Sequence, residues 1–356
     1  IRMPYILDYN TEVQIYRHFV QHDIDQYFLP HVLNDFARVI IATRMNHESA
    51  GMKQWIPDSK AYRKICDENL LLLKMDIYTG YIPPWVLPAD IKSFDAQKRR
   101  RIIDEGEIEG EHGISGRQSI QLFYDFFQRY RSQKPIRIEH LLNFFRHIPE
   151  AMRNLLPKNF LNALRNHYEY TILQEVKEAL YDYNQERIDA DIKNYLFALS
   201  FEPGTRVFNP YTQEEIEVSE QFYRAVEVYC CPSVNNDKER EKFRRDTQKQ
   251  FLASKLALGK HRLANRFTEL DLYKTFFQRY TNRLKEHVLD PLAENETFRM
   301  AIKEYGTKNF STYDNRIQQD VNLLFLNLQD KFGYTIEGAQ LICIHILDHD
   351  IIKKFS

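Results

Sequence analysis

The chain has 356 residues, of which 49 are lysine or arginine and 50 are aspartate or glutamate, so its formal net charge is −1. This balance argues against a strongly basic nucleic-acid-binding protein and against an acidic tail protein. Only 11 glycines occur, whereas tyrosine and phenylalanine number 22 and 24, which favours bulky contacts between helices. We therefore expect a mainly α-helical protein that is long enough for two domains.

The cysteines and the apolar runs point to a cytoplasmic protein. No C-x-x-C pair occurs, and the four cysteines are Cys66, Cys230, Cys231 and Cys343. This spacing suits neither a disulfide framework nor a zinc site, so we interpret them as core thiols. No signal peptide is recognisable, and runs such as residues 70–73 are too short to span a bilayer. Because the chain begins at Ile1 without a methionine, we expect a piece of a longer protein.

The N-terminal segment predicts two helices after a short extended stretch. Pro4 restricts residues 1–7 to an edge or a strand end. Thr11 and Gln14 fit a capping box, so a helix should begin at Thr11. A second helix is predicted by apolar residues spaced i, i+3, i+4 and i+7, namely Leu33, Phe36, Ala37 and Ile40.

Residues 76–113 interrupt the helical pattern. Glycine and prolines punctuate their start, and a basic run at 98–101 is followed by an acidic run at 104–111. This composition predicts an irregular insertion or a mobile flap. The basic run can bind phosphate or an acidic peptide, or it can form a solvated helix face paired with the acidic run, and we prefer the second interpretation.

Helical periodicity then returns and is broken once by a β-prone segment. Amphipathic helices are predicted over 120–127 and 138–145, followed by a core-facing stripe over 164–183. Residues 201–218 predict a small hairpin or structured loop, because Pro203-Gly204 and Asn209-Pro210 flank β-prone residues. Towards the C-terminus, residues 317–328 predict a helix, Gly333 is a candidate C-cap, and Thr335 can open a last helix.

Motifs of common catalytic and nucleotide sites do not occur in the sequence. There is no G-x-x-x-x-G-K-[ST], no G-x-G-x-x-G and none of the eukaryotic kinase signatures. His345 and His349 share an i, i+4 helix face that can in principle hold a metal ion. We prefer a solvated helix face there and predict no metal site.

Two segments are candidate binding sites. The sequence Gly113-Ile114-Ser115-Gly116-Arg117-Gln118 opens a helix, where an arginine can present its charged fork to phosphate or can simply be solvated. Residues 237–266 contain ten lysines or arginines and four acidic residues. The candidate phosphate or partner contacts in that segment are Arg244, Arg245, Lys260 and Arg262, with a solvated helix face as the alternative. We expect no nucleic-acid binding, because no docking module or set of interleaved aromatics accompanies these charges.

Several segments together resemble PrkA-type serine protein kinases. Residues 1–5 and 12–16 resemble the segment after the last core strand of that family's ATPase module, and Asp76 to Gly80 and Gly113 to Arg117 resemble its lid. Segments similar to its C-terminal domain are 183–185, 209–214, 333–335 and 341–343. These segments occur in the family's order across essentially the whole chain.

The resemblance implies an AAA+ core, a helical lid and a helical C-terminal domain. The end of the AAA+ module and the lid would occupy 1–150, with an insertion at 76–113, and the C-terminal domain 151–356. The Walker A and B strands would then precede Ile1. Arg117 would be the sensor arginine at the nucleotide γ-phosphate. ATP and Mg²⁺ are expected for the full-length protein but are not held by this chain alone.

The implied function is serine phosphorylation of protein substrates in concert with an AAA+ core of the same polypeptide. The resemblance also implies a cytoplasmic stress-response protein and a candidate homo-oligomer. We expect no membrane partner, because the apolar runs are too short to span a bilayer. Neither a catalytic base nor a metal ligand can be assigned, so the catalytic residues are unknown and this chain alone should be inactive. The alternative is a non-catalytic lid and substrate- or partner-binding module of an AAA+ ATPase that acts as a remodelling or proteolytic machine.

Overall fold

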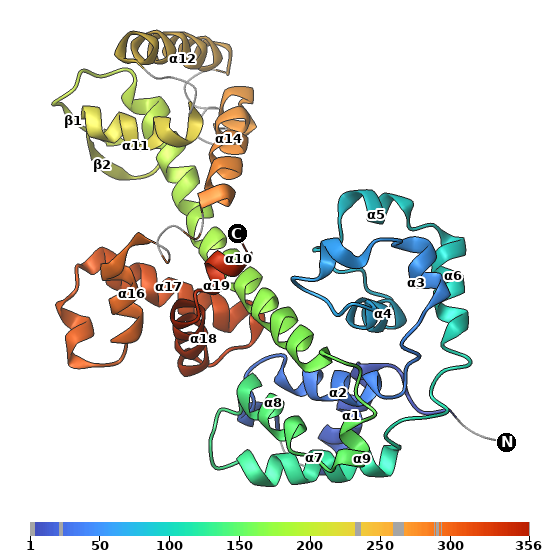
Figure 1. The fold of residues 1–356 in the computed structure, drawn as a ribbon. Coiled ribbons are helices and arrows are strands. Elements are labelled where there is room, and N and C mark those ends of the chain that lie inside the picture. The colour runs from blue at the N-terminus through green and yellow to red at the C-terminus, as the bar shows by residue number, and fades with distance from the viewer. Residues whose placement is uncertain are drawn as a thin grey trace. The chain divides into compact units, whose positions relative to one another are not determined.

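The computed structural model describes residues 4–20, 24–231, 236–258, 267–287, 289, 292 and 294–355. Within these residues the protein is mainly helical, with one two-stranded antiparallel sheet (Figure 1), which confirms the predicted fold class. The chain forms two compact units, residues 1–175 with 332–356 and residues 176–331. The long helix α10 (Phe160–Ala198) therefore contributes its first part to one unit and the rest to the other. These boundaries differ from the predicted division into 1–150 and 151–356, which separates a lid from a C-terminal domain and stays a prediction.

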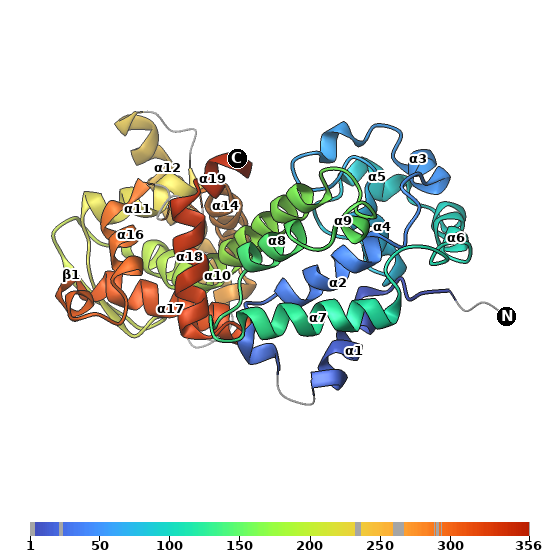
Figure 2. The same ribbon diagram turned by 60° about the horizontal axis from the view of Figure 1, so that its bottom comes forward.

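The first unit is built from helices of both chain ends together with the start of α10. These are α1 (Tyr9–Val20), α2 (Val32–Ala42), α3 (Ala50–Trp55), α4 (Leu71–Tyr78), α5 (Pro88–Ser93), α6 (Ala96–Glu105), α7 (Gly116–Tyr130), α8 (Ile138–Arg146), α9 (Glu150–Arg153), α18 (Ile336–Asp348) and α19 (Ile351–Phe355). Short 3-10 turns are η1 (Ile24–Tyr27) and η2 (Ser59–Tyr62). Figure 2 shows α1, α2 and α7 lying together in this unit.

Aromatic rings from four of these helices form the core around Phe36. Phe36 lies on α2, and its ring centroid is 5.5 Å from Tyr16 of α1, 5.2 Å from Phe126 of α7 and 4.9 Å from Phe145 of α8. Every residue of α2 except Asn34 is buried, because neighbouring helices cover the whole helix. The large side chains thus supply apolar burial and ring contacts at the centre of the unit.

Of two helix starts predicted from capping residues, one is confirmed and one is wrong. Thr335 caps α18 as expected, since its Oγ1 accepts a hydrogen bond from the Gly338 amide at 3.0 Å. The predicted start at Thr11 was wrong. Helix α1 begins at Tyr9, because the Asp8 carboxylate accepts hydrogen bonds from the amides of Asn10 at 2.7 Å and Thr11 at 3.2 Å.

The segment 76–113 contains two helices, α5 and α6, so the expectation of an irregular insertion was wrong in this part. Lys74 of α4 is completely buried and donates to Glu105 at 2.8 Å and to Glu109 at 2.7 Å. The preferred interpretation was a solvated helix face paired with the acidic run. The helix face is confirmed, but among the described residues the acidic run makes no ion pair with the basic run. Two of its glutamates bind a buried lysine, while the arginines at 99–101 lie exposed on α6.

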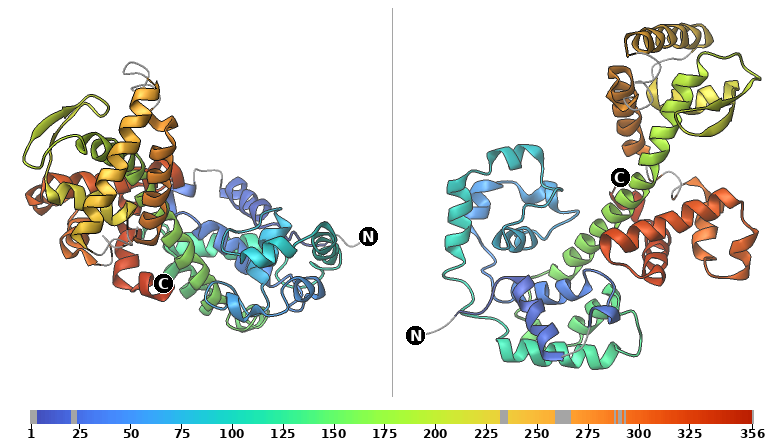
Figure 3. Two further views of the ribbon diagram at one scale, coloured as in Figure 1. Left: turned by 90° about the horizontal axis from the view of Figure 1, so that it is seen from above. Right: turned by 180° about the vertical axis from the view of Figure 1, so that it is seen from behind.

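The second unit combines a β-hairpin with helices. Its strands are β1 (Arg206–Asn209) and β2 (Glu214–Glu217), which pair antiparallel as predicted for 201–218. Its helices are the end of α10 with α11 (Glu220–Cys230), α12 (Asp237–Leu258), α14 (Asp271–His287), α16 (Glu296–Lys303) and most of α17 (Asn315–Phe332), with turns η3 (Phe267–Glu269) and η4 (Lys308–Thr312). Figure 3 shows the hairpin and these helices from two further sides.

Tyr195 of α10 is at the centre of the core of this unit. Its ring centroid lies 5.9 Å from Tyr223 of α11 and 5.8 Å from Phe276 of α14. The hairpin turn is held by Asn194 of α10, whose Oδ1 accepts hydrogen bonds from Asn209 and Thr212, both at 2.7 Å. The hairpin therefore rests on α10 through a buried polar anchor as well as through the apolar core.

Candidate functional site

Arg117 is the second residue of α7 and is exposed. The helix begins with a capping box: the Ser115 amide donates to Gln118 Oε1 at 3.0 Å, and the Gln118 amide donates to Ser115 Oγ at 3.4 Å. Across the described residues, the Arg117 guanidinium makes no hydrogen bond and no ion pair. The local sequence thus starts a helix and leaves a cation free at its N-terminus.

The glycine before this helix is needed for the path of the chain. Gly113 has φ +95°, a left-handed conformation, and a Cβ at this position would lie 2.2 Å from the carbonyl oxygen of Thr43. The next residue is held on both sides, since the Ile114 amide donates to Thr43 Oγ1 at 3.0 Å and its carbonyl accepts from Arg44 Nε at 2.8 Å. The backbone before α7 therefore lies directly against the end of α2.

A buried ion pair between Glu12 and Arg44 holds the start of α7 in place. Their side chains are 2% and 1% exposed, and Arg44 NH1 and NH2 donate to the two carboxylate oxygens at 3.0 and 3.1 Å. Glu12 also accepts from Ser119 Oγ of α7 at 2.5 Å and from Tyr16 at 3.2 Å. Burial is the main cause that raises the pKa of Tyr16 well above its usual value, so this hydroxyl stays protonated as a donor.

The geometry at the start of α7 can position a cation for an anionic group. The first turn of a helix carries partial positive charge and unpaired amides, and Arg117 adds a full charge with a planar donor fork. The helix start is pinned to α1 and α2 by buried polar contacts, so little order would be lost on binding. Among the described residues, no group of three or more histidine, cysteine, aspartate and glutamate side chains is placed to hold a metal ion.

The basic candidates of the second unit differ in their surroundings. Arg244 is already paired with acidic residues of the fold. It donates to Glu227 at 2.5 and 3.0 Å and to Glu220 at 2.8 Å. Its guanidinium also stacks on the Tyr223 ring, 4.5 Å from the centroid. Burial works against its charge, but hydrogen bonds to Glu227 and Glu220 raise the pKa of Arg244 above its usual value. Arg245 is exposed and only approaches Glu241 at 3.5 Å.

The remaining candidates of that segment, Lys260 and Arg262, lie outside the described residues. A phosphate or partner contact stays a prediction for all four residues. Arg245 has the more available charge of the two that are described.

The histidine pair near the C-terminus lies on α18 and just after it. The rings of His345 and His349 are 4.3 Å apart, and His349 Nδ1 lies 3.0 Å from the His345 carbonyl oxygen. A solvated face describes His349 but not His345, whose side chain is 16% exposed and whose Nδ1 lies 3.6 Å from Glu139. Burial is the largest cause that lowers the pKa of His345.

A second buried polar cluster, around Arg38, was not recognised from the sequence. Arg38 donates to Asp76 at 2.8 Å, approaches Asp35 at 3.4 Å and lies 3.2 Å from His167 Nδ1. Burial raises the pKa of Asp35 to about 6, and burial together with the Arg38 charge lowers the pKa of His167 well below its usual value. The available signal was a charged pair, Asp35 and Arg38, inside the apolar stripe of α2.

Comparison with known proteins identifies one family. A family model described as the PrkA serine protein kinase C-terminal domain matches residues 72–345. Apart from residues 1–5 and 12–16, the segments that carried the sequence resemblance lie within this range. No curated protein and no solved structure matches the chain.

None of the described helices combines the length and apolarity needed to cross a membrane.

Proposed function

The chain belongs to the family of PrkA serine protein kinase C-terminal domains, and we propose that it contacts nucleotide and protein substrate beside an ATPase core of the same polypeptide. The core would bind ATP and Mg²⁺, and Arg117 would reach the γ-phosphate. The complete protein would transfer that phosphoryl group to serine in a protein substrate. We place it in the cytoplasm and in a stress response, as the sequence resemblance implies.

The observation that carries this proposal is an unpaired arginine on a firmly held helix start. Arg117 is exposed, whereas Ser119, two residues later, is buried and donates to Glu12. Phosphoryl transfer spreads negative charge over the oxygens of the transferred group, and a positioned arginine stabilises that charge. A guanidinium also binds two phosphate oxygens at once, which an ammonium group cannot do in the same geometry.

The remaining catalytic functions are assigned to the core in this proposal. A kinase needs a base near the substrate hydroxyl and metal ions on the phosphates. We assign neither role to a residue of this chain. Its contribution would be charge stabilisation and substrate positioning, with subunit contacts in a homo-oligomer formed mainly by the core.

The test compares arginine variants in the full-length protein. Arg117→Ala should lower the rate of ATP turnover and of serine phosphorylation by about tenfold to a thousandfold, and Arg117→Lys should restore only part of it. Arg131→Ala is the matched control, because Arg131 is an exposed arginine at the other end of α7. ATP turnover unchanged by Arg117→Ala would reject the sensor role.

A second candidate is a partner-binding module without a direct role in phosphoryl transfer. It is favoured by α12, where Lys238, Lys242, Arg245 and Lys249 are all exposed. Arg117→Ala in the full-length protein separates the two, because a module without a direct role in phosphoryl transfer leaves ATP turnover unchanged. This chain alone and the full-length protein are also incubated with labelled ATP and a protein substrate, and phosphoserine formed by the chain alone would exclude both the binding-module function and the assignment of catalysis to the core. Degradation of the substrate without phosphorylation would instead favour a proteolytic machine.

A further inference from the structure

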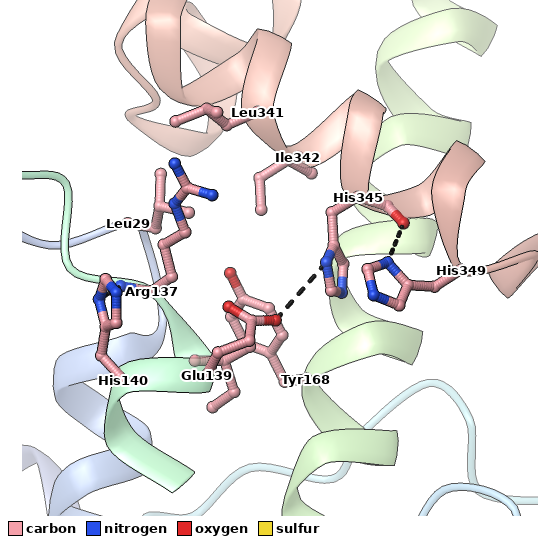
Figure 4. A pocket seen from close by; sticks show the side chains of 10 residues that line it. Leu29, Arg137, Glu139, His140, Tyr168, Leu341, Ile342, His345 and His349 are labelled. Carbon is pink, nitrogen blue, oxygen red and sulfur yellow. Dashed lines mark hydrogen bonds and ion pairs between the residues drawn. The ribbon is translucent and has the colours of Figure 1, made fainter. Parts of the chain in front are cut away.

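A pocket of about 230 Å³ lies in the first unit between α8, the first part of α10 and α18 (Figure 4). Its apolar wall consists of Leu29, Ile138, Leu341 and Ile342. Its polar side chains are Arg137, Glu139, His140, Tyr168, His345 and His349. An apolar wall with a few converging polar groups is the usual composition of a small-molecule site.

The Tyr168 hydroxyl is buried in this pocket. Tyr168 is 1% exposed, and its hydroxyl makes no hydrogen bond to any residue that the structure describes. Figure 4 shows the hydroxyl pointing into the space between Arg137 and Ile342. Burial raises the pKa of Tyr168 well above its usual value, so the group is a neutral donor. Buried hydroxyl groups are nearly always hydrogen-bonded, so this donor indicates a ligand acceptor.

Arg137 supplies the charge at the rim of the pocket. It immediately precedes α8, and its amide donates to His140 Nδ1 at 3.2 Å. Its guanidinium makes neither an ion pair nor a hydrogen bond with any described residue. Arg137 and Tyr168 therefore present a planar cationic fork and a hydroxyl donor to the same space, which suits an oxyanion.

A carboxylate in the pocket wall limits the charge of that oxyanion. Glu139 lies 3.6 Å from His345 Nδ1 and places a carboxylate in the pocket wall (Figure 4). Glu139 repels negative charge on the ligand, and this repulsion grows with the ligand's charge, so a single carboxylate fits better than a phosphate.

Size and wall composition restrict the rest of the ligand. The volume equals that of roughly eight liquid water molecules and is below the range of about 300–1,000 Å³ for drug-sized ligands. A body of a few carbon atoms would fill it. The side chains of Ile138, Leu341 and Ile342 favour an aliphatic body over a polar one.

We propose that this pocket binds a small aliphatic monocarboxylate, which accepts hydrogen bonds from Arg137 and Tyr168 and packs its hydrocarbon against α8 and α18. This function is separate from nucleotide contact by Arg117 and does not depend on it. Because the ligand would touch both α8 and α18, binding would stabilise the contact between these two helices.

The test measures binding to the purified chain by isothermal titration calorimetry. The probes are 4-methylpentanoate, its neutral analogue 4-methylpentanamide, and inorganic phosphate. We expect saturable binding of the carboxylate, binding of the amide at least about tenfold weaker, and no binding of phosphate. Equal binding of acid and amide, tighter binding of phosphate, or no saturation by the carboxylate would each overturn the proposal.

Two variants connect binding to the named donors. Tyr168→Phe removes only the unpartnered hydroxyl, so the melting temperature should not fall, while carboxylate binding weakens about tenfold. Arg137→Gln should weaken binding at least as much, and Arg146→Gln, an exposed arginine at the other end of α8, should leave it unchanged. A Tyr168→Phe protein that keeps its melting temperature and binds the carboxylate as tightly as the parent chain would contradict the assignment.

Discussion

Removing Arg44 should destabilise the first unit strongly, because it leaves Glu12 charged and buried. The two side chains are 1% and 2% exposed, and the pair is joined by two hydrogen bonds of 3.0 and 3.1 Å. In Arg44→Met the carboxylate keeps only the hydroxyl donors of Ser119 and Tyr16. Breaking one side of a buried pair typically costs about 3–5 kcal/mol. That is a large fraction of a domain stability of about 5–15 kcal/mol.

Urea unfolding followed by tryptophan fluorescence measures this loss directly. Both tryptophans, Trp55 and Trp85, lie in the first unit, so the signal reports the unit that contains the ion pair. The double variant Glu12→Gln with Arg44→Met removes both charges. It should therefore lose at least about 2 kcal/mol less than the sum of the two single variants.

The reasoning fails if Arg44→Met costs less than about 1 kcal/mol, or if the two substitutions are additive. The matched control is Glu48→Gln in the pair with Lys53, where the side chains are 82% and 66% exposed. This surface pair should leave the urea midpoint unchanged. A large effect at Glu48 would show that charge removal in general, and not burial, causes the loss.

Three other predictions rest on separate features. Gly113→Ala should lower the free energy of unfolding in urea by more than about 2 kcal/mol, because a Cβ there meets a backbone oxygen. Gly116→Ala is the control, because a Cβ there has no atom within 4 Å, and it should stabilise α7 by up to about 1 kcal/mol. Arg244→Met should cost about 2 kcal/mol, less than a fully buried pair, because its side chain is 15% exposed. Asp35→Asn should gain stability relative to the parent chain by about 2 kcal/mol between pH 4 and pH 7, measured as the difference in the free energy of unfolding.

The sign of the Asp35 effect follows from its raised pKa. Its value is about 6 in the folded chain and 3.8 for an ordinary aspartate, so the folded state holds this proton more tightly. The resulting stabilisation is complete below about pH 4 and is lost as the pH rises through 6. A difference between the two proteins that does not change with pH would contradict this. Equal losses in Gly113→Ala and Gly116→Ala, or an Arg244→Met protein as stable as its parent, would refute the other two.

Local patterns predicted many of the elements correctly. Periodic apolar residues marked α2, α7 and α8, and the dipeptides around 203–210 marked the hairpin. These features depend on residues within about one or two helical turns of each other. The start of α1 was predicted wrongly because two capping residues, Asp8 and Thr11, lie three residues apart. Asp8 is the one that accepts hydrogen bonds from the free amides.

The candidate site was predictable only in part. Arg117 was found because glycine and serine before an arginine are local signals of a helix start. That its helix is anchored by Glu12 and Arg44, which are 32 residues apart, was not predictable from spacing. The same limit applies to Lys74, which binds glutamates 31 and 35 residues away.

The helical class, the hairpin, the family and the arginine at the start of α7 were predictable from local sequence, because propensity, periodicity and capping act over a few residues. Which charges are buried and paired depends on how the helices pack. Arg244 is paired with Glu227, whereas Arg117 is exposed, although both are arginines in charged segments. The tertiary structure also brought Arg137, Tyr168 and His345 to one pocket from three helical regions of the chain. Burial and charge partners depend on contacts between distant segments, and these arise only when the helices pack.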